Sequence, residues 1–106
     1  MEQIKPFSEI TPEHIQNWKA RYGNVLSEVT VGSAQFIVRI PSRRTIDLMA
    51  QYGRKNELVA ANNTLISNCV LGGDLDEMEQ DGSIYTGLLE QLTKVLSKKE
   101  ASIKKI

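Results

Sequence analysis

The stretch FIVRIPSRRTIDLM, residues 36–49, marks a change from strand to helix. Its first half alternates between two faces, with Phe36, Val38 and Ile40 on one of them, and such alternation in a β-branched run is typical of a half-buried strand. Pro41 ends this strand, because proline has no N–H to donate and keeps the preceding residue extended. The first half therefore predicts a strand that ends at Ile40.

The second half of the same stretch predicts a helix that begins after Ser42. Serine is a favoured N-cap residue, and Ile46 and Met49 follow it at helical spacing. Gly53 gives the expected end of this helix.

Upstream, a short helix is expected over residues 12–22. Thr11 supplies a capping hydroxyl, proline follows at the first helical position, and Gly23 is a typical stop. Residues 1–10 carry no comparable pattern and are expected to be loosely attached. His14 has neither a cysteine nor a second histidine near it in the sequence, so we expect a solvated helix residue rather than a catalytic base.

A β-hairpin is expected between this helix and residues 36–49. Residues 25–31 alternate in the same way as residues 34–40, and Gly32-Ser33 between them suits a two-residue primed turn. An isolated hairpin is marginal in water, so it has to pack on the helices or pair with another chain. An uncovered edge of this hairpin would be a natural assembly surface.

Downstream, a helix is expected over residues 57–70, with Asn56 as its cap and Gly72-Gly73 as its stop. Its expected buried stripe consists of Leu58, Ala61, Leu65, Ile66 and Cys69.

The acidic segment at residues 74–81 resembles a calcium-binding loop in composition. It does not match the calcium-loop pattern that would begin at Asp74, because that pattern requires Asp or Asn where the chain has Met78 and Gly where it has Glu79. Asp74 with Glu77 instead matches a local D-x-x-E capping arrangement, and Asp81 or Ser83 is expected to cap the next helix.

The last helix is expected to run from about residue 83 toward the C-terminus, with apolar residues at helical period from Ile84 onward. A helix over residues 84–106 would be ~35 Å long, about the diameter of a globule of this size, so residues 97–106 are expected to project or fray. Ile103 and Ile106 stand alone among lysines, and they are either part of a fraying tail or a contact for a second chain.

The bulk composition indicates one domain, residues 1–106, with 13 basic and 13 acidic side chains. This balance lacks the basic excess of most nucleic-acid binders, so nucleic acid is not expected as the main partner. The single cysteine, Cys69, excludes an internal disulfide and fits a reducing cytoplasm. The chain shows neither a signal-peptide pattern nor an apolar run near the ~20 residues that cross a bilayer, so a soluble intracellular protein without a membrane partner is expected.

No catalytic, cofactor or metal constellation is evident in the sequence, so we do not expect an enzyme. The candidate sites are partner-binding surfaces. Arg43 and Arg44 lie in the first turn of a helix, where they are either exposed, paired with the acids of residues 74–81, or bound to an acidic partner surface. Phosphate binding is a further alternative, although no Gly-rich cradle accompanies the two arginines. The second candidate is the distal helix with Leu96, Ile103 and Ile106.

Several motifs occur together and in order along the chain. They are WKxxYG at residues 18–23, FIVRIPSR at residues 36–43, NCVLGGD at residues 68–74, a polar acidic turn, and a long leucine-bearing helix that ends in KxxxIKKI. In this combination the chain resembles the small tail-assembly chaperone-type proteins of tailed phages and prophages. The resemblance covers residues 18–106.

The expected elements together give an α+β domain with a short N-terminal helix, a β-hairpin and then about three helices, of which the C-terminal one is long. The resemblance implies a non-catalytic interaction protein in the cytoplasm of a bacterial host. Its partner would be a long helical protein of the tape-measure type, held soluble by many copies until the tail tube forms, and self-association is also expected. A long amphipathic helix cannot bury its apolar stripe alone, which gives such a holder a physical purpose. The alternatives are a structural tail or baseplate component, and a nucleic-acid-binding regulator that uses Arg39, Arg43, Arg44 and Arg54.

Overall fold

The computed structural model describes residues 5–23, 26–96 and 102–106. Its elements, in chain order, are η1 (Phe7–Glu9), α1 (Pro12–Tyr22), β1 (Leu26–Val31), β2 (Ala34–Arg39), α2 (Arg43–Arg54), α3 (Leu58–Cys69), β3 (Val70–Gly73), α4 (Leu75–Gln80) and α5 (Gly82–Leu96). The chain is therefore an α+β protein with a short N-terminal helix, a β-hairpin and a helical C-terminal half, as the sequence predicts.

The predicted hairpin is confirmed, and it forms two strands of an antiparallel sheet of order β1-β2-β3. Val31 pairs with Ala34 around the turn, and the register continues without a break to Leu26. Gly32 has a φ of +59°, which is the conformation that a type II′ turn requires at its first central position.

The prediction that Gly72-Gly73 ends a helix is wrong, because α3 continues directly into the strand β3. Gly72 lies opposite Ile37 of β2 in the antiparallel register. A Cβ at Gly72 would stand 2.7 Å from Ile10 Cδ1 and 2.9 Å from Trp18 Cη2, closer than real side chains approach. Glycine here allows the N-terminal segment to lie against the sheet.

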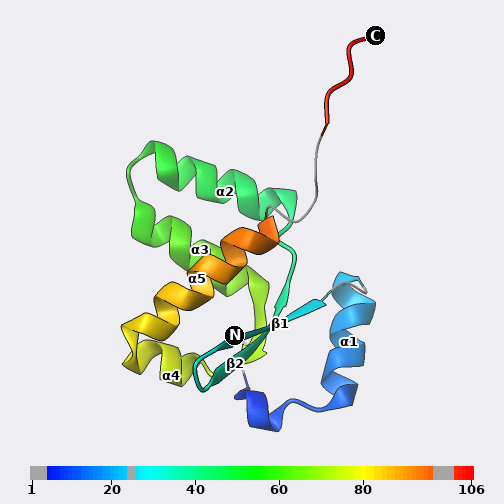
Figure 1. Cartoon of the computed structure of the whole chain (residues 1–106), viewed down its shortest axis with the longest axis vertical. Helices are drawn as coiled ribbons and strands as arrows, with labels where there is room; N and C mark the ends of the chain where they lie inside the picture. The colour runs from blue at the N-terminus through cyan, green and yellow to red at the C-terminus, as the bar shows by residue number, and fades with distance from the viewer. Residues whose placement is uncertain (1–4, 24–25, 97–101) are drawn as a thin grey trace.

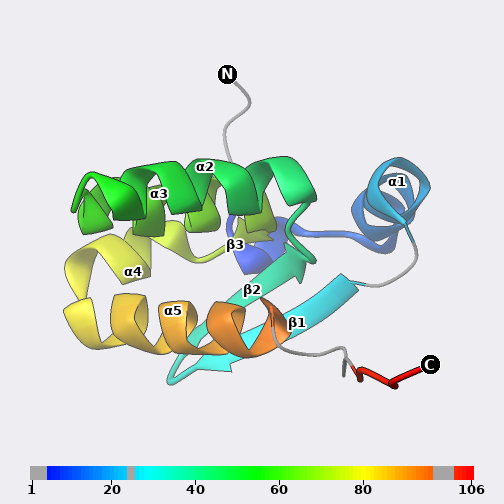
Figure 2. The ribbon, with the colours of Figure 1, turned by 90° about the horizontal axis from the view of Figure 1, so that it is seen from above.

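Helices cover the sheet on both sides, with α1 on one side and α2–α5 on the other (Figures 1 and 2). The core lies between the sheet and the larger helical group, and Phe36, Leu88 and Leu92 in it are fully buried. Together, its buried members are Val29, Ala34, Phe36, Val38, Leu65, Ile66, Cys69, Val70, Met78, Ile84, Leu88 and Leu92.

Asp74 does not cap α4 with its side chain, contrary to the D-x-x-E prediction. One carboxylate oxygen accepts a hydrogen bond from the backbone N–H of Phe7 (3.1 Å), and the other accepts one from the backbone N–H of Gln35 (2.9 Å). Its own N–H donates to the Gln35 carbonyl (3.0 Å). Asp74 thus joins three segments, and it helps to hold residues 5–10, which were expected to be loose, at the end of the sheet.

The last helix, α5, begins close to the predicted residue 83, but it does not continue to the C-terminus as predicted. The Asp81 carboxylate accepts hydrogen bonds from the N–H (2.9 Å) and hydroxyl (2.6 Å) of Ser83, which lowers the pKa of Asp81. α5 has 15 residues, and residues 102–106 are not helical, so the predicted helix over residues 84–106 is too long. The remaining part of the predicted projecting tail, residues 97–101, lies outside the described residues.

The start of α3 also differs from the prediction. Asn56 was expected to cap this helix, but it adopts a φ of +58° in the turn before it. The residue at the cap position is Glu57, which makes no side-chain cap hydrogen bond. Asn56 therefore shapes the connection between α2 and α3, since asparagine tolerates this left-handed conformation better than most residues.

Candidate interaction surface

One edge of the sheet, along β1, has no strand or loop beside it within the described residues. The main-chain groups of Gln35 point toward β3 and Asp74, so those of Thr30, the residue opposite Gln35 on β1, point the other way. Alternation along the strand places the N–H and C=O of Leu26, Glu28 and Thr30 on this open edge. We call these residues the β1 edge.

The opposite edge, along β3, carries the protection that natural sheets use against pairing with other chains. β3 has four residues, its pairing with β2 shifts register between Ile37 and Val38, and it contains two glycines. In addition, the Gly73 N–H donates to the Lys5 carbonyl (2.9 Å). The β1 edge has none of these features, and Glu28 is its one charged residue.

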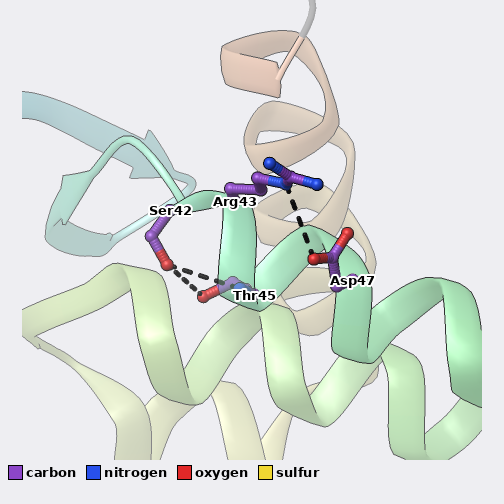
Figure 3. Close-up of polar contacts among 4 residues, drawn as sticks. All are labelled: Ser42, Arg43, Thr45 and Asp47. Atoms are coloured by element: carbon purple, nitrogen blue, oxygen red, sulfur yellow. Dashed lines mark hydrogen bonds and ion pairs between the residues drawn. The ribbon is translucent and has the colours of Figure 1, made fainter.

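Arg43 and Arg44 lie at the start of α2. Ser42 caps this helix as the sequence indicates, and Figure 3 shows it with Arg43, Thr45 and Asp47. The Ser42 hydroxyl accepts a hydrogen bond from the Thr45 N–H (3.3 Å). Arg43 pairs with Asp47 one turn later, at 3.7 Å between Nε and Oδ2, with its side chain 93% exposed. Such an exposed pair contributes about 0.3–0.5 kcal/mol.

Of the alternatives left open for Arg43 and Arg44, the structure favours exposure over pairing with residues 74–81. Both arginines are exposed, and the acid that Arg43 meets is on its own helix. This corner therefore remains accessible to an acidic partner.

The wider arginine patch of the nucleic-acid alternative is dispersed. Arg39 is occupied: its Nε donates to the Asn68 carbonyl (2.7 Å), and its guanidinium carbon lies 4.5 Å from the ring centroid of Tyr22. Arg54, at the other end of α2, is roughly 16 Å along the helix axis from Arg43. Arg54 is therefore separated from the Arg43 and Arg44 corner, and Arg39 already has partners within the chain.

The tail candidates are only partly described. Ile103 and Ile106 are fully exposed, with relative accessibilities of 101% and 121%. Leu96 is the last residue of α5, and its side chain falls outside the described part of the structure. The structure shows no contact between either isoleucine and the core, among the residues that it describes.

An exposed apolar pair that the sequence did not indicate lies at the start of α3. Leu58 and Val59 are 66% and 71% exposed, so the prediction that Leu58 belongs to the buried stripe is wrong, whereas the remainder of that stripe is buried. The pair stands where α2 connects to α3, at the end of the helical pair remote from the sheet (Figure 1). Helical periodicity predicts on which face of a helix a residue lies. It does not predict whether another element packs against that face at the first turn of the helix. We call Leu58 and Val59 the α3 tip.

His14 and Cys69 both have structural roles, His14 at a helix cap and Cys69 in the core. His14 completes a capping box: its Nδ1 accepts from the Thr11 N–H (3.0 Å), and its own N–H donates to the Thr11 hydroxyl (3.3 Å). Cys69 is buried in the core, and burial raises the pKa of its thiol to about 11, although the Arg39 guanidinium acts in the opposite direction.

No three His, Cys, Asp or Glu side chains come together within the described residues in a way that could hold a metal ion. None of the helices described is both long enough and apolar enough to pass through a bilayer.

Comparison with protein-family models, with curated proteins and with solved structures found no match to this chain.

Proposed function

We propose that this chain is a non-catalytic assembly chaperone that binds a long, amphipathic helical protein of the tape-measure type and keeps it soluble during assembly of a phage or prophage tail. It would act in the cytoplasm of the bacterial host, in many copies per partner, and would also associate with itself. The sequence resemblance suggests this role, and the α3 tip is the structural observation that supports it most.

The α3 tip suits weak, repeated binding to a helical partner. Leu58 and Val59 expose about two thirds of their surface, and burying a whole aliphatic side chain is worth about 1.5–3 kcal/mol. Each side chain could therefore contribute roughly 1–2 kcal/mol when a partner covers it. That is too little for tight binding by one copy, but many copies along one helical partner would gain from multivalency.

The exposed arginine corner fits the same proposal. Arg43 and Arg44 on α2 are accessible, and an amphipathic helical partner carries charged side chains beside its apolar stripe, of which the acidic ones would pair with these arginines. Charges at the rim of such a contact mainly guide orientation and speed of association, while the apolar pair supplies most of the binding free energy.

The test is a pull-down of the helical partner with Leu58→Ser/Val59→Ser. Because both side chains are already exposed, this variant should keep its fold and lose most of the captured partner. The matched variant Ile103→Ser/Ile106→Ser makes the same kind of change in the tail. Loss of capture in the tail variant alone would place the contact in the tail and contradict a role for the α3 tip.

A further inference from the structure

We propose that the β1 edge binds the β1 edge of a second copy of this chain, in an antiparallel pairing related by a two-fold axis that passes close to Val29. This inference rests on the proposed function in one respect, because it names the surface for the self-association that the proposal includes.

The first argument is the difference between the two edges of one sheet. β3 is short, shifted in register and joined by hydrogen bonding to Lys5, whereas β1 is a regular six-residue strand. β1 contains no proline, lysine or bulge, which are common means of preventing strand addition. The β3 edge is thus protected in several ways, whereas the β1 edge is protected only by one glutamate. The β1 edge is therefore the one that can accept a further strand.

The second argument is that the β1 edge complements itself. The outward N–H and C=O groups of Glu28 and Thr30 alternate along the edge, so in an antiparallel copy centred on Val29 each of these donors meets an acceptor, whereas Leu26 falls opposite Gly32 of the turn. A two-fold pairing uses the same strand from both chains and closes as a dimer. An identical strand is therefore the simplest occupant that fits this edge.

The third argument favours one register over the others, because it excludes the one centred on Glu28 and gives Glu28 a polar partner. If Glu28 stood directly opposite Glu28 of the second copy, two like charges would be adjacent, which destabilises strand pairing. A two-fold axis at Val29 instead places Glu28 of each chain opposite Thr30 of the other, where the hydroxyl can donate to the carboxylate. Glu28 already accepts a hydrogen bond from Gln35 Nε2 (3.1 Å) on this face of the sheet.

The consequence for function is that the unit meeting the helical partner would be a dimer. Each dimer would present two α3 tips and two arginine corners, so a single encounter could engage the partner twice.

The experiment uses the purified chain alone, with no helical partner present, so that its outcome is independent of the pull-down result. Sedimentation velocity from about 10 µM to about 1 mM should show a monomer–dimer equilibrium. Thr30→Glu should raise the dimer dissociation constant at least about tenfold, because it places glutamate opposite Glu28 twice in each dimer. Adding Glu28→Lys to this variant should restore dimerisation, because lysine then faces glutamate at both positions.

The control is Asn63→Glu, which adds the same charge on the exposed surface of α3 and should leave the dimer unchanged. Circular dichroism checks that every variant is folded. A wild-type chain that stays monomeric at about 1 mM would overturn the proposal, as would Thr30→Glu behaving like Asn63→Glu. Failure of the Glu28→Lys/Thr30→Glu variant to dimerise would overturn the register centred on Val29.

Discussion

Replacement of Asp74 is expected to be among the more damaging polar substitutions in this chain. Its carboxylate accepts two backbone hydrogen bonds, from Phe7 (3.1 Å) and Gln35 (2.9 Å), in a half-buried position. A hydrogen bond to a charged group is worth about 1.5–3 kcal/mol, and partial access of water lowers the sum of the two. We therefore expect Asp74→Ala to lower the free energy of unfolding by about 2–4 kcal/mol.

Asp76 provides the matched control, because it is an exposed carboxylate on α4 two residues away. Asp76→Ala should change the free energy of unfolding by less than about 0.5 kcal/mol, as surface substitutions usually do. Thermal and urea unfolding followed by circular dichroism give both values, and a loss of 2–4 kcal/mol corresponds to a fall in Tm of roughly 10–25 °C. Amide hydrogen exchange at Phe7 and Gln35 should accelerate in Asp74→Ala only. Equal stability of the two variants would refute the role assigned to the Asp74 carboxylate.

Two further predictions concern the core. A Cβ at Gly87 of α5 would stand 2.6 Å from Val31 Cγ1. Gly87→Ala should therefore destabilise the wild type by up to about 2 kcal/mol, but it should stabilise a Val31→Ala background by about 1 kcal/mol, because the shorter side chain leaves room for the new methyl group. A double-mutant cycle in urea measures both values, and the same sign in both backgrounds would contradict this packing. The Cys69 thiol, buried and with its pKa raised from 9.0 to about 11, should react with iodoacetamide at pH 8 only after unfolding. Fast alkylation of the folded chain would contradict burial of the thiol. Because the pKa of Cys69 is higher in the folded state than in the unfolded state, the contribution of this thiol to stability should be fully present below about pH 9 and should be lost as the pH rises toward 11.

The sequence predicts those parts of the fold that depend on neighbouring residues. The hairpin follows from alternation on either side of Gly32-Ser33, and the start of α2 follows from Pro41 and Ser42, because each signal acts over a few residues. Both predictions are confirmed by the register of β1 with β2 and by the Ser42 cap.

The features that the sequence did not predict depend on segments far apart in the chain. Residues 70–73 form a strand because β2 offers them an edge more than thirty residues earlier, and their own pattern of two glycines after a helix resembles a helix stop. Asp74 resembles a local cap, yet its partners are 39 and 67 residues away. The exposure of Leu58 depends on where neighbouring elements end, which helical periodicity does not encode.

The same distinction applies to the candidate site. Sequence reasoning indicated the hairpin edge and the arginine corner, because a hairpin has edges and a first-turn arginine is poorly placed for its own helix. It could not say that β1 rather than β3 is the open edge, because that requires the strand order. It also could not indicate the α3 tip, since Leu58 fits a buried pattern.

The central claim is tested most directly by co-expressing this chain with a long helical protein of the tape-measure type and measuring the soluble fraction and the bound stoichiometry of the large protein. The account predicts that the large protein becomes soluble only in the presence of this chain and that many copies co-purify with it. If the large protein stays insoluble while this chain remains soluble and unbound, the chaperone proposal is contradicted.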